Sequence, residues 1–238
     1  MEKIPVYLGL IFASTTALAL FFFYRSTRKS RLVLIIAIVW LTIQSSLGLS
    51  GFYKTSGTIP PKFILLILPP LVTIVFLFIT VPGIRFINGL NMKWLTLLHM
   101  LRIPVEIVLL LLFVNKSIPR VMTFEGRNMD ILSGITAGLI YYFGFIKKNL
   151  DTRIMLVWNF ICLGLLLNIV VIGILSAPSP IQQFAFDQPN IAIYYFPFVW
   201  LPSFIIPLVL LAHFAAIRQV LKQNTKQKMI WRQSVTPL

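Results

Sequence analysis

The feature that most constrains this chain is a succession of long apolar segments separated by short connections. A helix needs roughly 20 mainly apolar residues to cross the hydrocarbon core of a bilayer. Segments of this kind fill most of the chain and leave no room for a soluble domain beside them. The pattern therefore predicts an all-α, polytopic transmembrane bundle of about seven spans. The expected spans are Ile4–Tyr24, Leu32–Gly51, Phe63–Val81, Trp94–Val114, Asp130–Ile146, Ile154–Ser176 and Ile193–Ile217.

The composition agrees with a membrane protein and excludes several other classes. Of the 238 residues, 58% are hydrophobic and 11% are charged, whereas a soluble domain carries about 25% charged residues. A single cysteine, Cys162, excludes an intramolecular disulfide and a cysteine-based metal cage. We find no P-loop, Rossmann glycines, zinc-protease motif or serine-hydrolase elbow, which makes an enzyme the less favoured class.

The distribution of the 21 lysines and arginines predicts the orientation. Fourteen of them fall in the connections after spans one, three and five and in the C-terminal tail, and six fall on the opposite side. Because cytoplasmic loops accumulate Lys and Arg, the N-terminus is expected outside and the C-terminus in the cytoplasm, in a bacterial inner membrane. Residues 1–217 then form the transmembrane domain. A weak internal sequence repeat suggests a 3+1+3 arrangement, in which the fourth span joins two repeats of three helices. Residues 218–238 form a basic cytoplasmic tail that binds anionic lipids rather than nucleic acid.

The fourth predicted span carries the most informative polar residues. His99, Arg102 and Glu106 fall on one helix face, and Arg102 and Glu106 have the i,i+4 spacing of an ion pair. A charge at the bilayer centre costs at least about 2.5–3.5 kcal/mol on insertion scales, so such groups face the bundle interior. We expect this face to line a cavity for a small ligand or a proton; the alternative is an internal ion pair that only fixes helix packing.

The last span adds two candidates to this cavity. Pro202 interrupts the helix and frees a backbone carbonyl, as helix breaks at carrier binding sites do. His213 is expected at the same depth as His99, and two such histidines could ligate a haem. No other cofactor and no metal site is predicted.

Two loops on the outer face form a candidate vestibule. Its expected members are Glu125, Arg127, Asp130 and Asp187, and the three acids among them are half of the six in the chain. Oxygen ligands of this kind suit a divalent cation, but their spacing is not diagnostic. The alternative is an ordered cap on the membrane surface.

Three functions remain open from these residues. The first is a small-molecule or ion-coupled transporter, or a related ligand-binding membrane protein, in which Glu106 responds to a proton or cation. The second is a haem-binding redox component that uses His99 and His213. The third is an accessory subunit of a membrane complex, or a homo-oligomer, without chemistry of its own.

Overall fold

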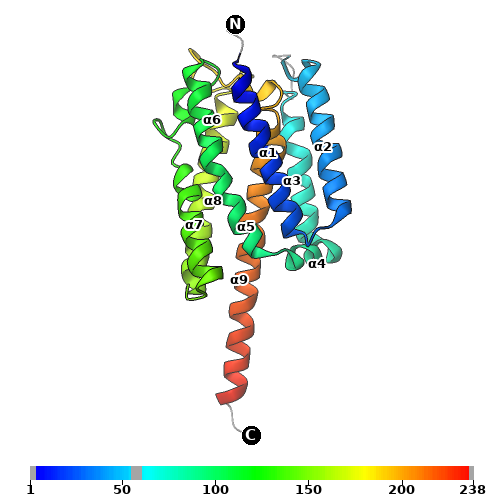
Figure 1. The fold of residues 1–238 in the computed structure, drawn as a ribbon, viewed down its shortest axis with the longest axis vertical. Helices are drawn as coiled ribbons and strands as arrows, with labels where there is room; N and C mark the ends of the chain where they lie inside the picture. The colour runs from blue at the N-terminus through cyan, green and yellow to red at the C-terminus, as the bar shows by residue number, and fades with distance from the viewer. Residues whose placement is uncertain (1–3, 55–60, 236–238) are drawn as a thin grey trace.

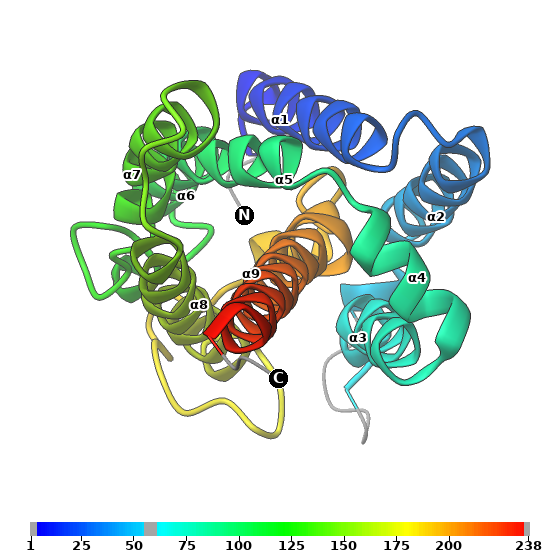
Figure 2. The ribbon, with the colours of Figure 1, turned by 90° about the horizontal axis from the view of Figure 1, so that it is seen from below.

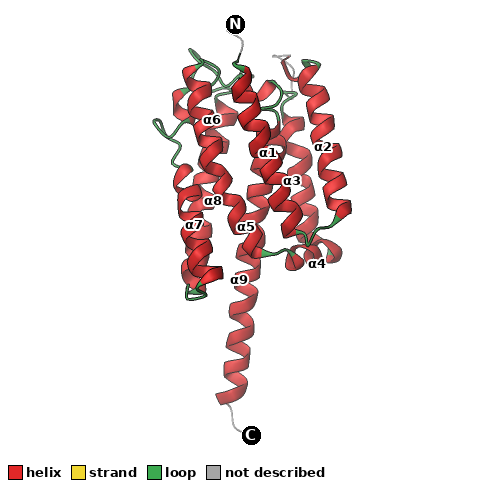
Figure 3. Cartoon of the chain, in the orientation of Figure 1, coloured by secondary structure: helices red, strands yellow, loops and turns green. Residues whose placement is uncertain are grey.

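A computed structural model describes residues 4–54 and 61–235, with side chains up to residue 223. Within these ranges the regular elements are helices and no strand occurs (Figure 3), so the expected all-α class is confirmed. The α-helices are α1 (Val6–Ser26), α2 (Arg31–Leu49), α3 (Ile64–Ile79), α4 (Val81–Gly89), α5 (Met92–Leu98), α6 (Arg102–Val114), α7 (Ile131–Tyr141), α8 (Thr152–Leu175) and α9 (Ile206–Val235).

Five helical segments of the described chain are long and apolar enough to cross a membrane. They are Val6–Ser26, Arg31–Leu49, Met92–Val114, Thr152–Leu175 and Leu201–Gln223. The pair α3 and α4 would make a sixth as one broken span, although the two helices are bent by 95°. The fifth predicted span is the shorter apolar helix Ile131–Ile146. Each of the seven predicted segments contains a helix, but the seventh begins at Leu201 and not at the predicted Ile193, and the count of seven spans is not confirmed.

The sharp bend between α3 and α4 has local causes in the sequence. Thr80 accepts a hydrogen bond from the Gly83 N–H and caps α4, and Pro82 stands in the first turn, where a missing N–H costs nothing. A Cβ on Gly83 would lie 2.5 Å from the Cα of Leu77, so only glycine allows α4 to fold back this tightly. As a result α4 lies across one end of the bundle (Figures 1 and 2).

The last helical segment is wound irregularly and then runs far beyond the bundle. A π-helical turn, Leu201–Ile205, leads into α9, which continues to Val235. Figure 1 shows the end of α9 projecting past the other helices. The predicted boundary after Ile217 therefore does not coincide with a helix end, and the start of the basic tail is a continuation of the last span.

A tryptophan on α2 supplies a hydrogen bond that the backbone of this last segment lacks. Pro207 has no N–H to donate to the carbonyl of Ser203, four residues earlier. The indole N–H of Trp40 donates to that carbonyl instead, at 2.9 Å. A second tryptophan, Trp200, donates to the Leu41 carbonyl at 3.1 Å, so α2 is tied to the last segment at this level.

The segment from Leu201 onward lies near the middle of the bundle, with α8 on one side, α3 and α4 on the opposite side and α5 on a third (Figure 2). It packs against α8, α5 and α3, and its side chains are mostly buried as far as Val220. The surrounding helices turn large apolar side chains outward, for example Val6 at 78% exposure and Leu32 at 68%. Soluble monomers rarely expose apolar surface on this scale.

Candidate functional site

A close approach between α7 and α6 builds the polar centre of the bundle. At Gly134 a Cβ would lie 2.8 Å from the side chain of Ile103, so the glycine lets the two helices touch. Asp130 stands one turn earlier, at the start of α7, and this contact brings it to α6. Arg102 Nη1 donates to Asp130 Oδ1 at 2.7 Å, and both side chains are buried.

Arg102 also binds two groups of the neighbouring helices. Its Nη1 donates to the Cys162 carbonyl at 3.2 Å, and its Nη2 lies 2.7 Å from His213 Nε2. A guanidinium can only donate, so His213 Nε2 accepts and the proton resides on Nδ1. His213 Nδ1 then donates to Asn159 Oδ1 at 2.9 Å. The contacts therefore fix His213 as a neutral imidazole with both nitrogens engaged.

His99 lies against His213 rather than across a cofactor slot. The two rings stack with centroids 4.1 Å apart and an interplanar angle of 26°. Axial haem ligation needs each imidazole to offer a free nitrogen to one iron held between them. His213 has no free nitrogen, and stacked rings leave no slot. The haem interpretation of this pair does not fit the geometry.

Glu106 does not bond Arg102, which corrects the expected i,i+4 ion pair. Asn128 Nδ2 donates instead to Glu106 Oε1 at 2.6 Å, and the Asn128 Oδ1 accepts from the Asp130 N–H at 3.0 Å. Arg102 pairs with Asp130 because the close approach of α7 supplies a second carboxylate. The other oxygen of Glu106, Oε2, is buried and has no hydrogen-bond partner.

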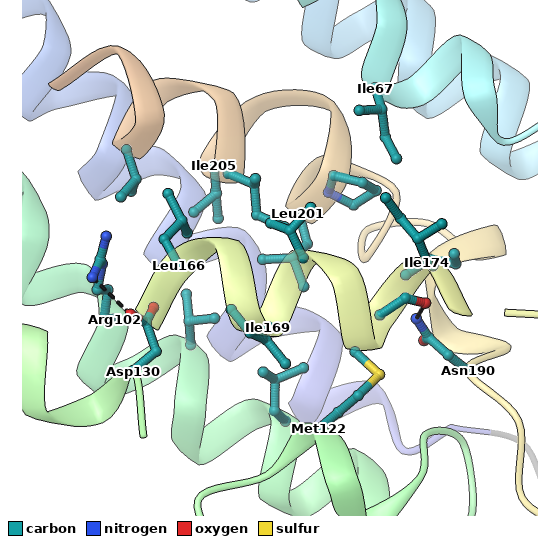
Figure 4. A pocket seen from close by; sticks show the side chains of 18 of the residues that line it. Ile67, Arg102, Met122, Asp130, Leu166, Ile169, Ile174, Asn190, Leu201 and Ile205 are labelled. Atoms are coloured by element: carbon teal, nitrogen blue, oxygen red, sulfur yellow. Dashed lines mark hydrogen bonds and ion pairs between the residues drawn. The ribbon is translucent and has the colours of Figure 1, made fainter. Parts of the chain in front are cut away.

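Beside these groups lies a cavity of about 80 Å³, here called the central cavity (Figure 4). Its wall is mostly Leu, Ile and Val side chains from α6, α8 and the last segment. The polar residues in the wall are Arg102, Glu106, Asp130 and Asn190. Figure 4 shows Arg102 and Asp130 at one end and Asn190 at the other. The Asn190 side-chain NH₂ donates to the Gly173 carbonyl, and the buried Oδ1 of Asn190 has no hydrogen-bond partner.

The predicted cavity residues divide into two groups. Arg102, Glu106 and Pro202 line the central cavity. His99 and His213 are buried beside Arg102 but are not part of the cavity wall. His213 therefore binds the arginine and His99 packs against His213, so the ionisable face of the predicted fourth span is divided between packing contacts and the cavity.

The predicted outer vestibule is not assembled as one cluster. Glu125, Arg127 and Asp187 are exposed, while Asp130 is buried against Arg102, which corrects its assignment to the vestibule. In the described part of the chain, no group of three or more His, Cys, Asp and Glu side chains is placed to hold a metal ion.

Three asparagines of the site were not identified from the sequence as members of it. Asn159 orients His213, Asn128 holds Glu106, and Asn190 ends the central cavity. Asn159 lies within an apolar span, where polar side chains usually form hydrogen bonds to a neighbouring helix. The sequence therefore indicated that Asn159 has an interhelical partner. Its partner, 54 residues away, could not be read from spacing.

The fold and the site define an all-helical bundle of membrane-spanning-length helices around a buried ionic centre. The chain belongs to the family described as Domain of unknown function (DUF8737), whose model matches residues 60–221. That range holds α3 to α8, the π-helical turn and the first half of α9, and so includes every polar residue of the central cavity. No curated protein matches the chain. No solved structure matches it.

Proposed function

We propose that this chain is an integral membrane protein that binds a small molecule in the central cavity. Five helices of spanning length and the apolar outward faces of α1 and α2 support the membrane assignment. Counting the bent α3–α4 pair and the short α7 as crossings gives seven. The start of α1 and the end of α9 then lie on opposite sides, as they do in Figure 1.

The positive-inside rule sets the orientation of this proposal. The connections that carry Arg28, Arg85 and Lys147 lie at the end of the bundle from which α9 projects (Figure 1). That end is the cytoplasmic face, and the N-terminus lies outside. A single cysteine and short connections suit a bacterial inner membrane, with the basic tail on its anionic lipids.

The observation that carries the binding proposal is the unpartnered oxygen of Glu106 beside the central cavity. Leaving a buried acceptor unpaired costs about 1–3 kcal/mol. Such groups are retained where a ligand or an ordered water satisfies them. The wall is otherwise apolar, so the fitting ligand has a small apolar body and a hydroxyl or amine donor that reaches Glu106.

Ion-coupled transport is the fuller form of the same proposal. Arg102 is engaged by Asp130 and His213, which leaves Glu106 as the carboxylate that a proton or a ligand can reach. Pro202 lines the same cavity within a π-helical turn, a local irregularity of the kind that recurs at functional sites. If a proton and the donor group of the ligand replace each other at Glu106, the movement of protons across the membrane would be coupled to the movement of the ligand.

Glu106→Gln tests this proposal with little change in volume. Asn128 Nδ2 requires an acceptor, so the glutamine oxygen stays on Asn128 and its NH₂ points to the cavity. The cavity then offers a donor in place of an acceptor. We expect benzylamine, whose protonated ammonium group only donates, to raise the melting temperature of the detergent-purified wild type more than toluene does, because toluene has the same ring without a donor.

The exposed Glu125→Gln is the matched control. The difference between benzylamine and toluene should persist in this control and vanish in Glu106→Gln, because two donors cannot bond each other. An equal difference in Glu106→Gln would place binding elsewhere, and no difference in the wild type would remove the proposed ligand class.

A further inference from the structure

A second and larger hollow opens on the cytoplasmic half of the bundle. It has a volume of about 650 Å³ and is bounded by α2, α3, α4 and the last segment. In Figure 2, α4 lies between the ends of α2 and α3, and α9 lies on the side toward the middle of the bundle. We call it the lateral groove. Its lining includes Val33 and Ala37 of α2, Thr73 and Leu77 of α3, and Pro207.

The lateral groove offers almost nothing to a polar ligand. The hydroxyls of Thr73 and Thr80 donate to carbonyls of their own helix, at 2.9 and 2.8 Å. Ser203 donates to the Val199 carbonyl at 2.7 Å, and the Trp40 N–H is used by the Ser203 carbonyl. Each of these lining polar groups is already paired, so hydrocarbon is the occupant that loses no hydrogen bond.

The length of the groove matches one leaflet of a bilayer. Along α3 it runs from Pro69 to Thr80, which spans about 16 Å at the helical rise of about 1.5 Å per residue. Half of a hydrocarbon core of about 30 Å is about 15 Å. The groove therefore extends from near the bilayer midplane to the cytoplasmic interface, as an acyl chain of the inner leaflet does.

The cytoplasmic end of the groove is positively charged. Arg31 is exposed in the first turn of α2, and Arg85 is exposed on α4, and both helices bound this end of the groove. Arg28 and Lys29 are also exposed, in the connection between α1 and α2. Among the described residues, the acid at the cytoplasmic end is Asp151. It lies in the connection between α7 and α8, on the side of the bundle away from the groove (Figure 2). A phosphate at the mouth of the groove would meet cations without a competing carboxylate.

We propose that the lateral groove binds one acyl chain of an anionic phospholipid, with the headgroup held by Arg31 and Arg85. The lipid stands where side chains of a neighbouring helix would otherwise pack, between α2 and α3. This inference rests on the membrane location proposed above but not on ligand binding in the central cavity. The lipid is an inner-leaflet component, and it is bound apart from the basic tail.

Competition between two lipids tests the proposal. Detergent-purified protein is incubated with equal amounts of dioleoyl phosphatidylglycerol and dioleoyl phosphatidylcholine, and the retained lipid is counted by native mass spectrometry. The wild type should retain one phospholipid, with phosphatidylglycerol preferred by about tenfold, the ratio that 1.4 kcal/mol gives. The double variant Arg31→Gln, Arg85→Gln should lose that preference, while the outer-face variant Arg120→Gln, Arg127→Gln should keep it.

A second variant tests the acyl chain separately from the headgroup. Thr73→Phe should fill the groove and reduce retention of both lipids, because Thr73 lines it from an exposed position. Thr42→Phe is its control, since Thr42 is also exposed and bonds a carbonyl four residues earlier but does not line the groove. Equal retention in both variants would overturn the proposal. An unchanged preference for phosphatidylglycerol in the Arg31→Gln, Arg85→Gln variant would also overturn the proposal, because it would assign the preference to the basic tail.

Two further comparisons separate this proposal from the central cavity. Glu106→Gln should retain phosphatidylglycerol as the wild type does, and Thr73→Phe should still distinguish benzylamine from toluene. Loss of lipid retention in Glu106→Gln would contradict the independence of the two sites.

Discussion

The central cavity and the lateral groove are both apolar hollows, yet they suit different occupants. Around the central cavity, Glu106 and Asn190 each keep a buried oxygen without a partner. In the lateral groove, the hydroxyls and the indole N–H of the lining residues are paired within the protein. The kind of ligand that a hollow can bind is therefore indicated by its unpaired polar atoms rather than by its size.

The two regions should also differ in how much stability their polar residues supply. The largest effect is expected at the central pair, where Arg102→Ala should lower the free energy of unfolding by about 3–5 kcal/mol, because it leaves Asp130 buried and unpaired. Denaturant unfolding of the detergent-purified protein measures this. The exposed Arg127→Ala is the control and should stay within about 0.5 kcal/mol of wild type. A small loss in Arg102→Ala would mean that water reaches Asp130.

At the lateral groove, the largest effect should come from packing rather than charge. Gly83→Ala places a methyl group 2.5 Å from the Leu77 backbone and forces the bend between α3 and α4 to open. We expect a cost of about 1–3 kcal/mol in thermal unfolding. Gly89→Ala in the same helix meets nothing within 4 Å and should be neutral or slightly stabilising. Equal stability of the two variants would contradict the described bend.

A smaller effect should separate the two asparagines of α8. Asn159→Leu removes the acceptor of His213 Nδ1–H, and an unsatisfied buried donor costs about 1–3 kcal/mol. Asn168→Leu removes an exposed bond to the Arg127 carbonyl in the connection between α6 and α7, and exposed substitutions of this kind usually change stability by no more than about 0.5 kcal/mol. Thermal unfolding of both variants measures the difference. Similar losses would indicate that His213 finds another acceptor.

The smallest effect concerns the outer end of the bundle, above both hollows. Tyr53 donates to Gln44 Oε1 at 2.7 Å, and burial raises the pKa of Tyr53 to about 12. Because this pKa exceeds the unfolded value of about 10, its contribution to stability is complete below pH 10 and is lost as pH rises toward 12. The melting temperature of the wild type should fall more steeply over this range than that of Tyr53→Phe. Parallel slopes would contradict a buried Tyr53.

The sequence was sufficient for the features that depend on local composition. Long apolar runs predicted the helices, and the spacing of Arg102 and Glu106 placed both on one buried face. Thr80, Pro82 and Gly83 also carried the signals of a helix end and a new start, although we predicted a single span to Val81.

The sequence was insufficient where a contact joins distant segments. The spacing favoured Glu106 as the partner of Arg102, but the close approach at Gly134 brings in Asp130, 28 residues away. Matched depth suggested that His99 and His213 could share an iron, but depth does not reveal that the rings stack. Side-chain pairing across helices depends on rotation and distance, which one-dimensional spacing does not contain.

The most direct test of the account is a cryo-electron microscopy map of the protein in a lipid nanodisc, at a resolution that reveals ordered small molecules. The account predicts non-protein density within hydrogen-bond distance of Glu106 Oε2, extending among the apolar side chains toward Asn190. A cavity closed by repacked side chains, with both Glu106 oxygens bonded to the protein, would contradict it.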